Sequence, residues 1–76
     1  MTREARNIVN FYGGAALSNL VEDLRNDVPL TIIAERMNVS RQRVHQWKQA
    51  LGYEEKTWKP HPGVVEVIHD EERSKR

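Results

Sequence analysis

The stretch of residues 40–49 holds the side chains best suited to hydrogen bonding with a nucleic acid. It contains three glutamines, three cationic residues, one histidine and one serine, and it contains no acidic residue. In the major groove of DNA, glutamine can bond bidentately to adenine and arginine to guanine, while cations suit the phosphates. The candidate DNA-contacting residues are Ser40, Arg41, Gln42, Arg43, His45, Gln46, Lys48 and Gln49.

The charged residues are unevenly distributed along the chain, although the net charge of the 76 residues is only +1. Residues 30–53 carry four basic side chains against one acidic side chain, and no acidic residue occurs between Arg36 and Tyr53. Residues 1–29 and 54–76 each carry one more acidic than basic side chain. A basic stretch between acidic flanks favours a polyanionic partner; a solvated surface of mixed charge is the alternative.

Patterns that would support catalysis or metal binding are weak. The chain has no cysteine, which excludes a disulfide and a thiolate metal site. The histidines, the acidic runs and the paired glycines lack the spacings of a metal site or a phosphate-binding loop. These residues are His45, His61, His69, Glu54-Glu55, Asp70-Glu71-Glu72 and Gly13-Gly14. We therefore predict no enzymatic activity, no metal, no cofactor and no small-molecule ligand.

A helix over residues 41–51 would place the polar side chains together on one face. Its apolar residues recur at helical spacing and predict the buried face; they are Val44, Trp47 and Leu51. At about 100° per residue, the opposite face holds Arg41, Gln42, His45, Gln46 and Gln49. Arg43 and Lys48 fall at the margins. Ser40 is the expected N-cap, with its hydroxyl accepting the amide of residue 42 or 43, and Gly52 is the expected C′ residue.

The residues before this helix complete a helix-turn-helix pattern. Residues 30–37 form a short apolar helical stripe, in which Ala34 is small enough for a second helix to cross closely. Asn38 stands at the turn, which needs left-handed backbone, and asparagine adopts this conformation best after glycine. Val39 would then fill the angle between the two helices.

Residues 30–49 resemble the helix-turn-helix core of phage repressors and Cro-like regulators. The resemblance rests on Ala34, on Asn38 at a position where the family prefers glycine, and on a set of apolar positions. These positions are Ile33, Met37, Val39, Val44 and Trp47. The stretch from Ser40 to Trp47 is also similar to the helix that these regulators place in the major groove.

The resemblance implies a role for each polar residue of the second helix. Base contacts would come from Arg41, Gln42 and Gln46. Contacts to the DNA backbone would come from Arg43, Lys48 and Ser40, and His45 could make either kind. The resemblance covers about a quarter of the chain, and it does not assign a subfamily.

The residues before the motif predict two further helical stripes. Their apolar positions are Ala5, Ile8, Val9 and Tyr12, followed by Leu17, Leu20, Val21 and Leu24. Thr2 could cap the first stripe, and Gly13-Gly14 interrupts between them. The first stripe is either a separate helix or the start of a long kinked one. The second ends near residues 26–27, because Pro29 disfavours helical geometry in Val28.

The residues after the motif are harder to assign. Pro60 to Gly63 is turn chemistry, and the β-branched run of residues 64–68 favours a hairpin in which it pairs with residues 54–59. In that hairpin Trp58 would pair with Val65 and form an apolar face that holds a dimer together or, less favoured, a wing on the DNA. The alternative is a short helix that starts at Pro62. Residues 70–76 are charged throughout and predict a disordered tail.

The sequence therefore predicts a mainly α domain over residues 1–69, with a helix-turn-helix core at 30–51 and a short C-terminal β-hairpin. No apolar run is long enough to span a bilayer, and the absence of cysteine fits a bacterial cytoplasm or nucleoid. The leading hypothesis is a sequence-specific repressor of phage or mobile-element type that binds the major groove as a homodimer. The alternatives are an excisionase-like or packaging-type architectural protein, and an interaction module that binds RNA polymerase or another regulator.

Overall fold

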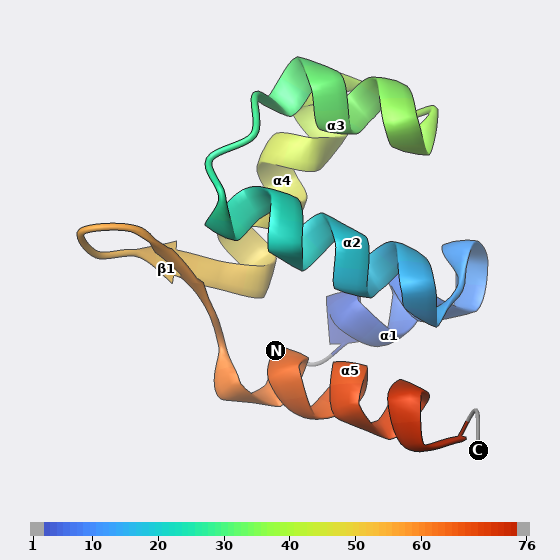
Figure 1. Cartoon of the computed structure of the whole chain (residues 1–76). Helices are drawn as coiled ribbons and strands as arrows, with labels where there is room; N and C mark the ends of the chain where they lie inside the picture. The colour runs from blue at the N-terminus through green and yellow to red at the C-terminus, as the bar shows by residue number, and fades with distance from the viewer. Residues whose placement is uncertain (1–2, 75–76) are drawn as a thin grey trace.

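The computed structural model describes residues 3–74, which form five helices and one two-stranded antiparallel hairpin (Figure 1). In chain order the elements are α1 (Arg3–Tyr12), α2 (Gly14–Arg25), α3 (Leu30–Met37), α4 (Arg41–Leu51), β1 (Gly52–Glu54), β2 (Trp58–Pro60) and α5 (Pro62–Ser74). The predicted fold class, mainly helical with a helix-turn-helix, is confirmed. No helix within these residues has the length and apolar character to cross a membrane.

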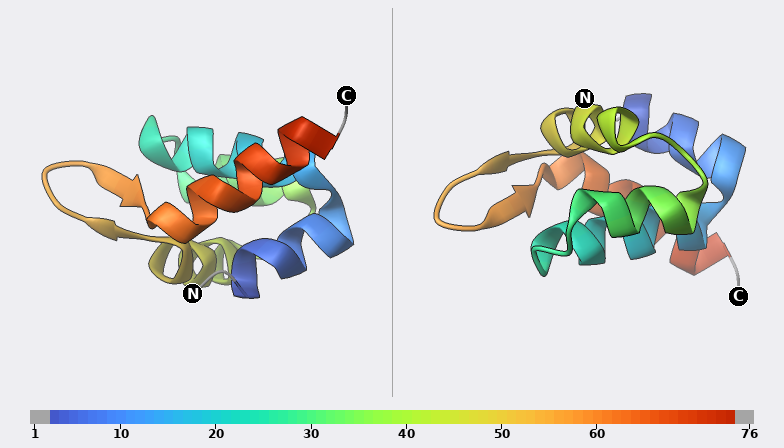
Figure 2. Two further views of the ribbon diagram at one scale, coloured as in Figure 1. Left: turned by 90° about the horizontal axis from the view of Figure 1, so that it is seen from below. Right: turned by 90° about the horizontal axis from the view of Figure 1, so that it is seen from above.

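All five helices and the second strand contribute to one apolar core. Its buried members are Ala5, Ile8, Leu17, Leu20, Val21, Leu24, Ile33, Ala34, Val44, Trp47, Leu51, Trp58, Val64 and Val67. Both views of Figure 2 place α1 and α4 side by side on one side of the molecule and α2 on the other, while α5 runs beneath in Figure 1. The hairpin projects from the end of α4.

The first two stripes form separate helices. Gly13 has φ 94° and ψ 161°, a conformation that L side chains rarely adopt, and the chain changes direction there. Ala5 and Ile8 are buried as predicted, whereas Tyr12 at the end of α1 is 42% exposed. The proposed cap, Thr2, lies outside the described residues.

The predicted short hairpin in the C-terminal part of the chain is confirmed, but its predicted strands are wrong. β1 and β2 pair Gly52 with Pro60, Tyr53 with Lys59 and Glu54 with Trp58, so that residues 55–57 form the turn. The predicted partner strand, residues 64–68, is part of α5. The alternative, a helix starting at Pro62, is correct.

Tertiary packing explains why a β-branched run forms a helix. In α5, Val64 and Val67 lie three residues apart on the inner face and are buried, while Glu66 points outward. The His61 carbonyl accepts hydrogen bonds from the amides of Val64 and Val65, so that the helix begins at Pro62. Burial of an amphipathic face outweighs the modest helix penalty of valine.

The predicted disordered tail is also helical as far as Ser74, while Lys75 and Arg76 lie outside the described residues. Asp70 and Arg73 form an ion pair one turn apart on α5. Glu71 lies against the start of α2, where a Cβ on Gly14 would approach its carboxylate oxygen to 2.8 Å. Charged residues thus continue the helix because its inner edge packs against α2.

Candidate nucleic-acid interface

The turn between α3 and α4 has the backbone geometry that the sequence predicts. Asn38 adopts φ 57° and ψ 47°, in the left-handed region. The amide of Val39 donates to the carbonyl of Ala34 at 3.0 Å, and the amide of Asn38 donates to that of Glu35 at 3.3 Å. These are the two bonds of a Schellman motif, which ends α3 and sends the chain into α4.

The N-terminus of α4 is capped by Ser40, as predicted. Its Oγ accepts a hydrogen bond from the amide of Arg43 at 3.1 Å, while its backbone is extended. The Ser40 hydroxyl hydrogen is still available, since the cap uses only the oxygen as acceptor. The free amides and the positive end of the helix dipole favour a negatively charged group at this terminus.

The two faces of α4 differ completely in burial. Val44, Trp47 and Leu51 are buried against the core. Seven of the eight predicted contact residues are exposed, namely Ser40, Arg41, Gln42, Arg43, His45, Gln46 and Gln49. The structure thus brings the predicted set together on one outer surface, which we call the α4 outer face. Lys48 is the exception, because its side chain is only 25% exposed.

The cations near the α4 outer face differ in the contacts that they already make within the chain. Lys48 Nζ lies 3.2 Å from Glu54 Oε1, and the Arg43 guanidinium lies over the Trp47 ring, 6.0 Å from its centroid. On α3, Arg36 pairs with Asp23 at 2.8 Å. Within residues 3–74, Arg41 forms neither an ion pair nor such a ring contact. Arg41 is therefore the α4 cation most available to an external anion.

The hairpin fastens the C-terminal end of α4. Trp58 Nε1 donates to the Lys48 carbonyl at 2.8 Å, and the His61 amide donates to the Leu51 carbonyl at 2.9 Å. Both carbonyls belong to the last turn, whose carbonyl groups have no amide donor inside the helix. No pattern in the sequence predicts this contact, because a tryptophan that caps a helix has no fixed spacing from it.

Gly52 does not have the predicted left-handed C′ conformation. Its backbone is extended, with φ −165° and ψ −165°, and it begins β1 directly after α4. A Cβ at this position would overlap the Lys59 carbonyl and the Trp58 indole. Glycine is needed here because the second strand and the tryptophan ring approach closely.

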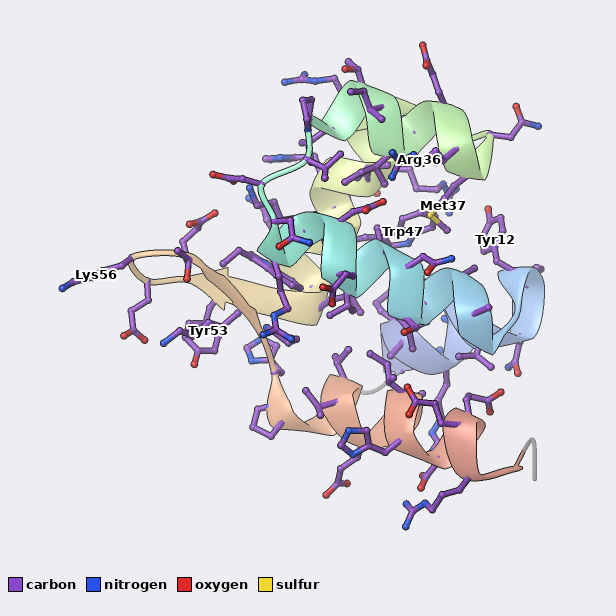
Figure 3. All side chains as sticks on the ribbon, in the orientation of Figure 1. Tyr12, Arg36, Met37, Trp47, Tyr53 and Lys56 are labelled. Carbon is purple, nitrogen blue, oxygen red and sulfur yellow. The ribbon has the colours of Figure 1, made fainter. Side chains whose placement is uncertain are left out.

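The apolar dimer face predicted for residues 53–69 is absent. Trp58 and Val67 are buried in the core of their own chain, and Val65 is half-buried on α5 rather than paired with Trp58. Lys56 extends at the tip of the hairpin (Figure 3). A homodimer and a DNA-contacting wing both remain predictions, and a dimer needs a different surface.

The geometry of the site is thus that of a capped helix with one exposed polar face, held at its far end by a hairpin. Comparison of the chain with protein-family models, with curated proteins and with solved structures finds no match.

Proposed function

We propose that this chain binds double-stranded DNA in a sequence-specific manner, with α4 in the major groove. The observation that carries the proposal is the α4 outer face. It is exposed, lacks acidic residues and belongs to the second helix of a tight helix-turn-helix. An 11-residue helix also has the dimensions that a B-DNA major groove admits.

The side chains of the α4 outer face have the hydrogen-bonding groups that base recognition requires. Gln42 and Gln46 lie one turn apart in the N-terminal half, which is the half that a recognition helix presents to base edges. Each amide can donate to and accept from adenine. Arg41 has a free guanidinium that suits a guanine or a phosphate.

The contacts to the DNA backbone would come from the edges of the same face. Ser40 and the first amides of α4 suit a phosphate at the helix N-terminus. Arg43 would reach a phosphate by leaving the Trp47 ring, and Lys48 by leaving Glu54. Both residues therefore exchange an existing contact for the new one.

The regulatory role we propose is repression of transcription in a phage or mobile element by occupancy of a promoter. Two copies of α4 would enter successive major grooves about 34 Å apart, which requires a two-fold dimer. An architectural protein would use the same helix without this symmetry. The symmetry of the preferred DNA site thus separates the two roles.

The experiment is selection of a binding site from a random duplex pool, followed by mobility shift with the selected site. We expect a short palindromic site that binds far more tightly than random duplex. A double variant, Gln42→Ala with Gln46→Ala, serves as the matched control and should recover no site. A wild-type chain that enriches no sequence and shifts no duplex would contradict the proposal. An enriched but asymmetric site would favour the architectural role.

A further inference from the structure

A groove lies between α1 and the beginning of α4, on the flank of the α4 outer face. It has a volume of about 580 Å³ and is lined by α1 on one wall and by the turn and α4 on the other. Its apolar lining includes Ile8 from α1, Val39 from the turn and Trp47 from α4. Tyr12 meets Trp47 edge to face at one end, with 5.8 Å between ring centroids (Figure 3).

Phe11 lines the same groove and is 83% exposed. It is the most exposed large hydrophobic side chain within residues 3–74, whereas the others in this class are near 40%. One surface thus carries both a protruding aromatic ring and a hollow lined by apolar and polar side chains. In a two-fold interface each subunit presents the same patch, so a knob and a hole in one patch are self-complementary.

The charges of the groove are also self-complementary. Glu4 lies on the α1 wall and Arg43 on the α4 wall. Within the described residues neither side chain forms an ion pair. An interface with an apolar centre and a polar, charged rim is typical of associating proteins.

We propose that this groove binds the same groove of a second copy of the chain. Phe11 of each subunit fills the hollow of the other, and Glu4 faces Arg43 of the partner subunit. The functional role of this dimer rests on the proposed function, because a palindromic DNA site needs two copies of α4. Ser40 and Arg43 line the groove, so in the dimer Arg43 pairs with the partner subunit and the cationic contacts to phosphates fall to Arg41 and Lys48. Gln42 and Gln46 do not line the groove and stay free.

The first test is sedimentation equilibrium of the full chain without DNA, over concentrations up to millimolar. We expect the wild type to form a reversible dimer. Phe11→Ala should raise the dissociation constant of the dimer about a hundredfold. A two-fold interface contains Phe11 twice, so the substitution removes two aromatic contacts. Ile32→Ala, at another exposed apolar residue, is the matched control and should dimerise as the wild type does. Far-UV circular dichroism melts check that each variant is folded.

Two outcomes of this test would overturn the interface. One is a wild type that stays monomeric at every concentration. The other is a Phe11→Ala variant that dimerises as well as the wild type. If the chain is monomeric alone and Phe11→Ala instead weakens DNA binding, then DNA occupies the groove and the dimer surface is wrong.

The second test is a charge exchange between the two walls of the groove. Glu4→Arg and Arg43→Glu each place like charges together across the two-fold axis and should each weaken the dimer about tenfold. An equimolar mixture of the two variants restores opposite charges at both positions and should recover the wild-type affinity as a heterodimer. A mixture no better than either variant alone would contradict the Glu4–Arg43 pairing.

These measurements separate the interface from the proposed function. A chain that recognises DNA as a monomer would overturn the interface and leave DNA binding intact. A chain that dimerises with this mutational signature and binds no DNA would do the reverse.

Discussion

The two ends of α4 are held in different ways. At the N-terminal end, Ser40 caps the helix and the side chains of residues 41–43 are exposed. At the C-terminal end, Trp58 and the His61 amide occupy two of the last carbonyls, and Lys48 is paired with Glu54. The N-terminal end presents hydrogen-bonding groups to the exterior. At the C-terminal end, the corresponding groups are bonded to other parts of the same chain.

Under the proposed function, this difference divides the helix into a recognition half and an anchoring half. A recognition helix must be held rigidly, since a small misplacement of its side chains loses bidentate geometry. The hairpin supplies that rigidity without covering the exposed half. Substitutions in the anchoring half should therefore reduce stability, and substitutions in the recognition half should reduce DNA binding alone.

The largest expected effect is loss of the fold on truncation after Gly52. The truncation removes three buried core side chains, Trp58, Val64 and Val67. Loss of one buried tryptophan costs about 3–5 kcal/mol, and a domain of 76 residues has a total stability of roughly 4–11 kcal/mol. Far-UV circular dichroism should show no cooperative thermal transition. A truncated chain that still melts cooperatively would show that residues 53–74 do not belong to the core.

A smaller effect, confined to binding, is expected in the recognition half. Gln42→Ala and Gln46→Ala should each weaken binding to the selected site by about 1–3 kcal/mol, because each removes one base contact. Binding to random duplex and the melting temperature should remain close to wild type, since both side chains are exposed. Fluorescence anisotropy with both duplexes provides the measurement. Equal losses on both would refute base recognition by that residue.

Trp58→Phe tests the anchoring half with less disruption. Phenylalanine keeps an aromatic ring in the core but removes the Nε1 donor from the Lys48 carbonyl. Leaving that part-buried carbonyl without its donor should lower the free energy of unfolding by about 1–2 kcal/mol. Urea unfolding followed by circular dichroism measures the change. Lys56→Ala at the hairpin tip serves as the control, and a Trp58→Phe curve that overlays the control would exclude an anchoring role for the hydrogen bond.

The smallest effect concerns the ion pair at the C-terminal end of α4. Glu54→Gln releases Lys48 from its carboxylate partner, which should strengthen DNA binding by up to about 1 kcal/mol. The slope of log affinity against log salt concentration should steepen by at most about one unit. Affinities at several salt concentrations would show this. A shallower slope, or weaker binding, would indicate that Lys48 does not reach the DNA.

The helix-turn-helix was predictable because its determinants are local. The left-handed Asn38, the Ser40 cap and the 3.6-residue spacing of Val44 and Trp47 all act within a few residues. Exposure of the glutamines followed from the same spacing. Pairing of Lys48 with Glu54 was not predictable, because it depends on how the chain folds back after α4.

The C-terminal region was mispredicted because its structure is set by tertiary contacts. The valines of α5 have strand propensity, yet Val64 and Val67 become helical to bury one face against α1 and α2. Gly52 was assigned a helix-ending conformation, whereas its role is to admit the Trp58 ring. The neighbours that decide α5 lie far along the chain, and the one that decides Gly52 lies across the hairpin turn.

The most direct test of the central claim is a nuclear magnetic resonance titration of amide-labelled chain with the selected duplex. We expect the largest chemical shift changes on residues 40–46, with smaller changes at Lys48 and Gln49. The hairpin turn, residues 55–57, should change least among the residues after α4. Changes centred on α3 or α5, with the amides of α4 unaffected, would contradict DNA recognition by the α4 outer face.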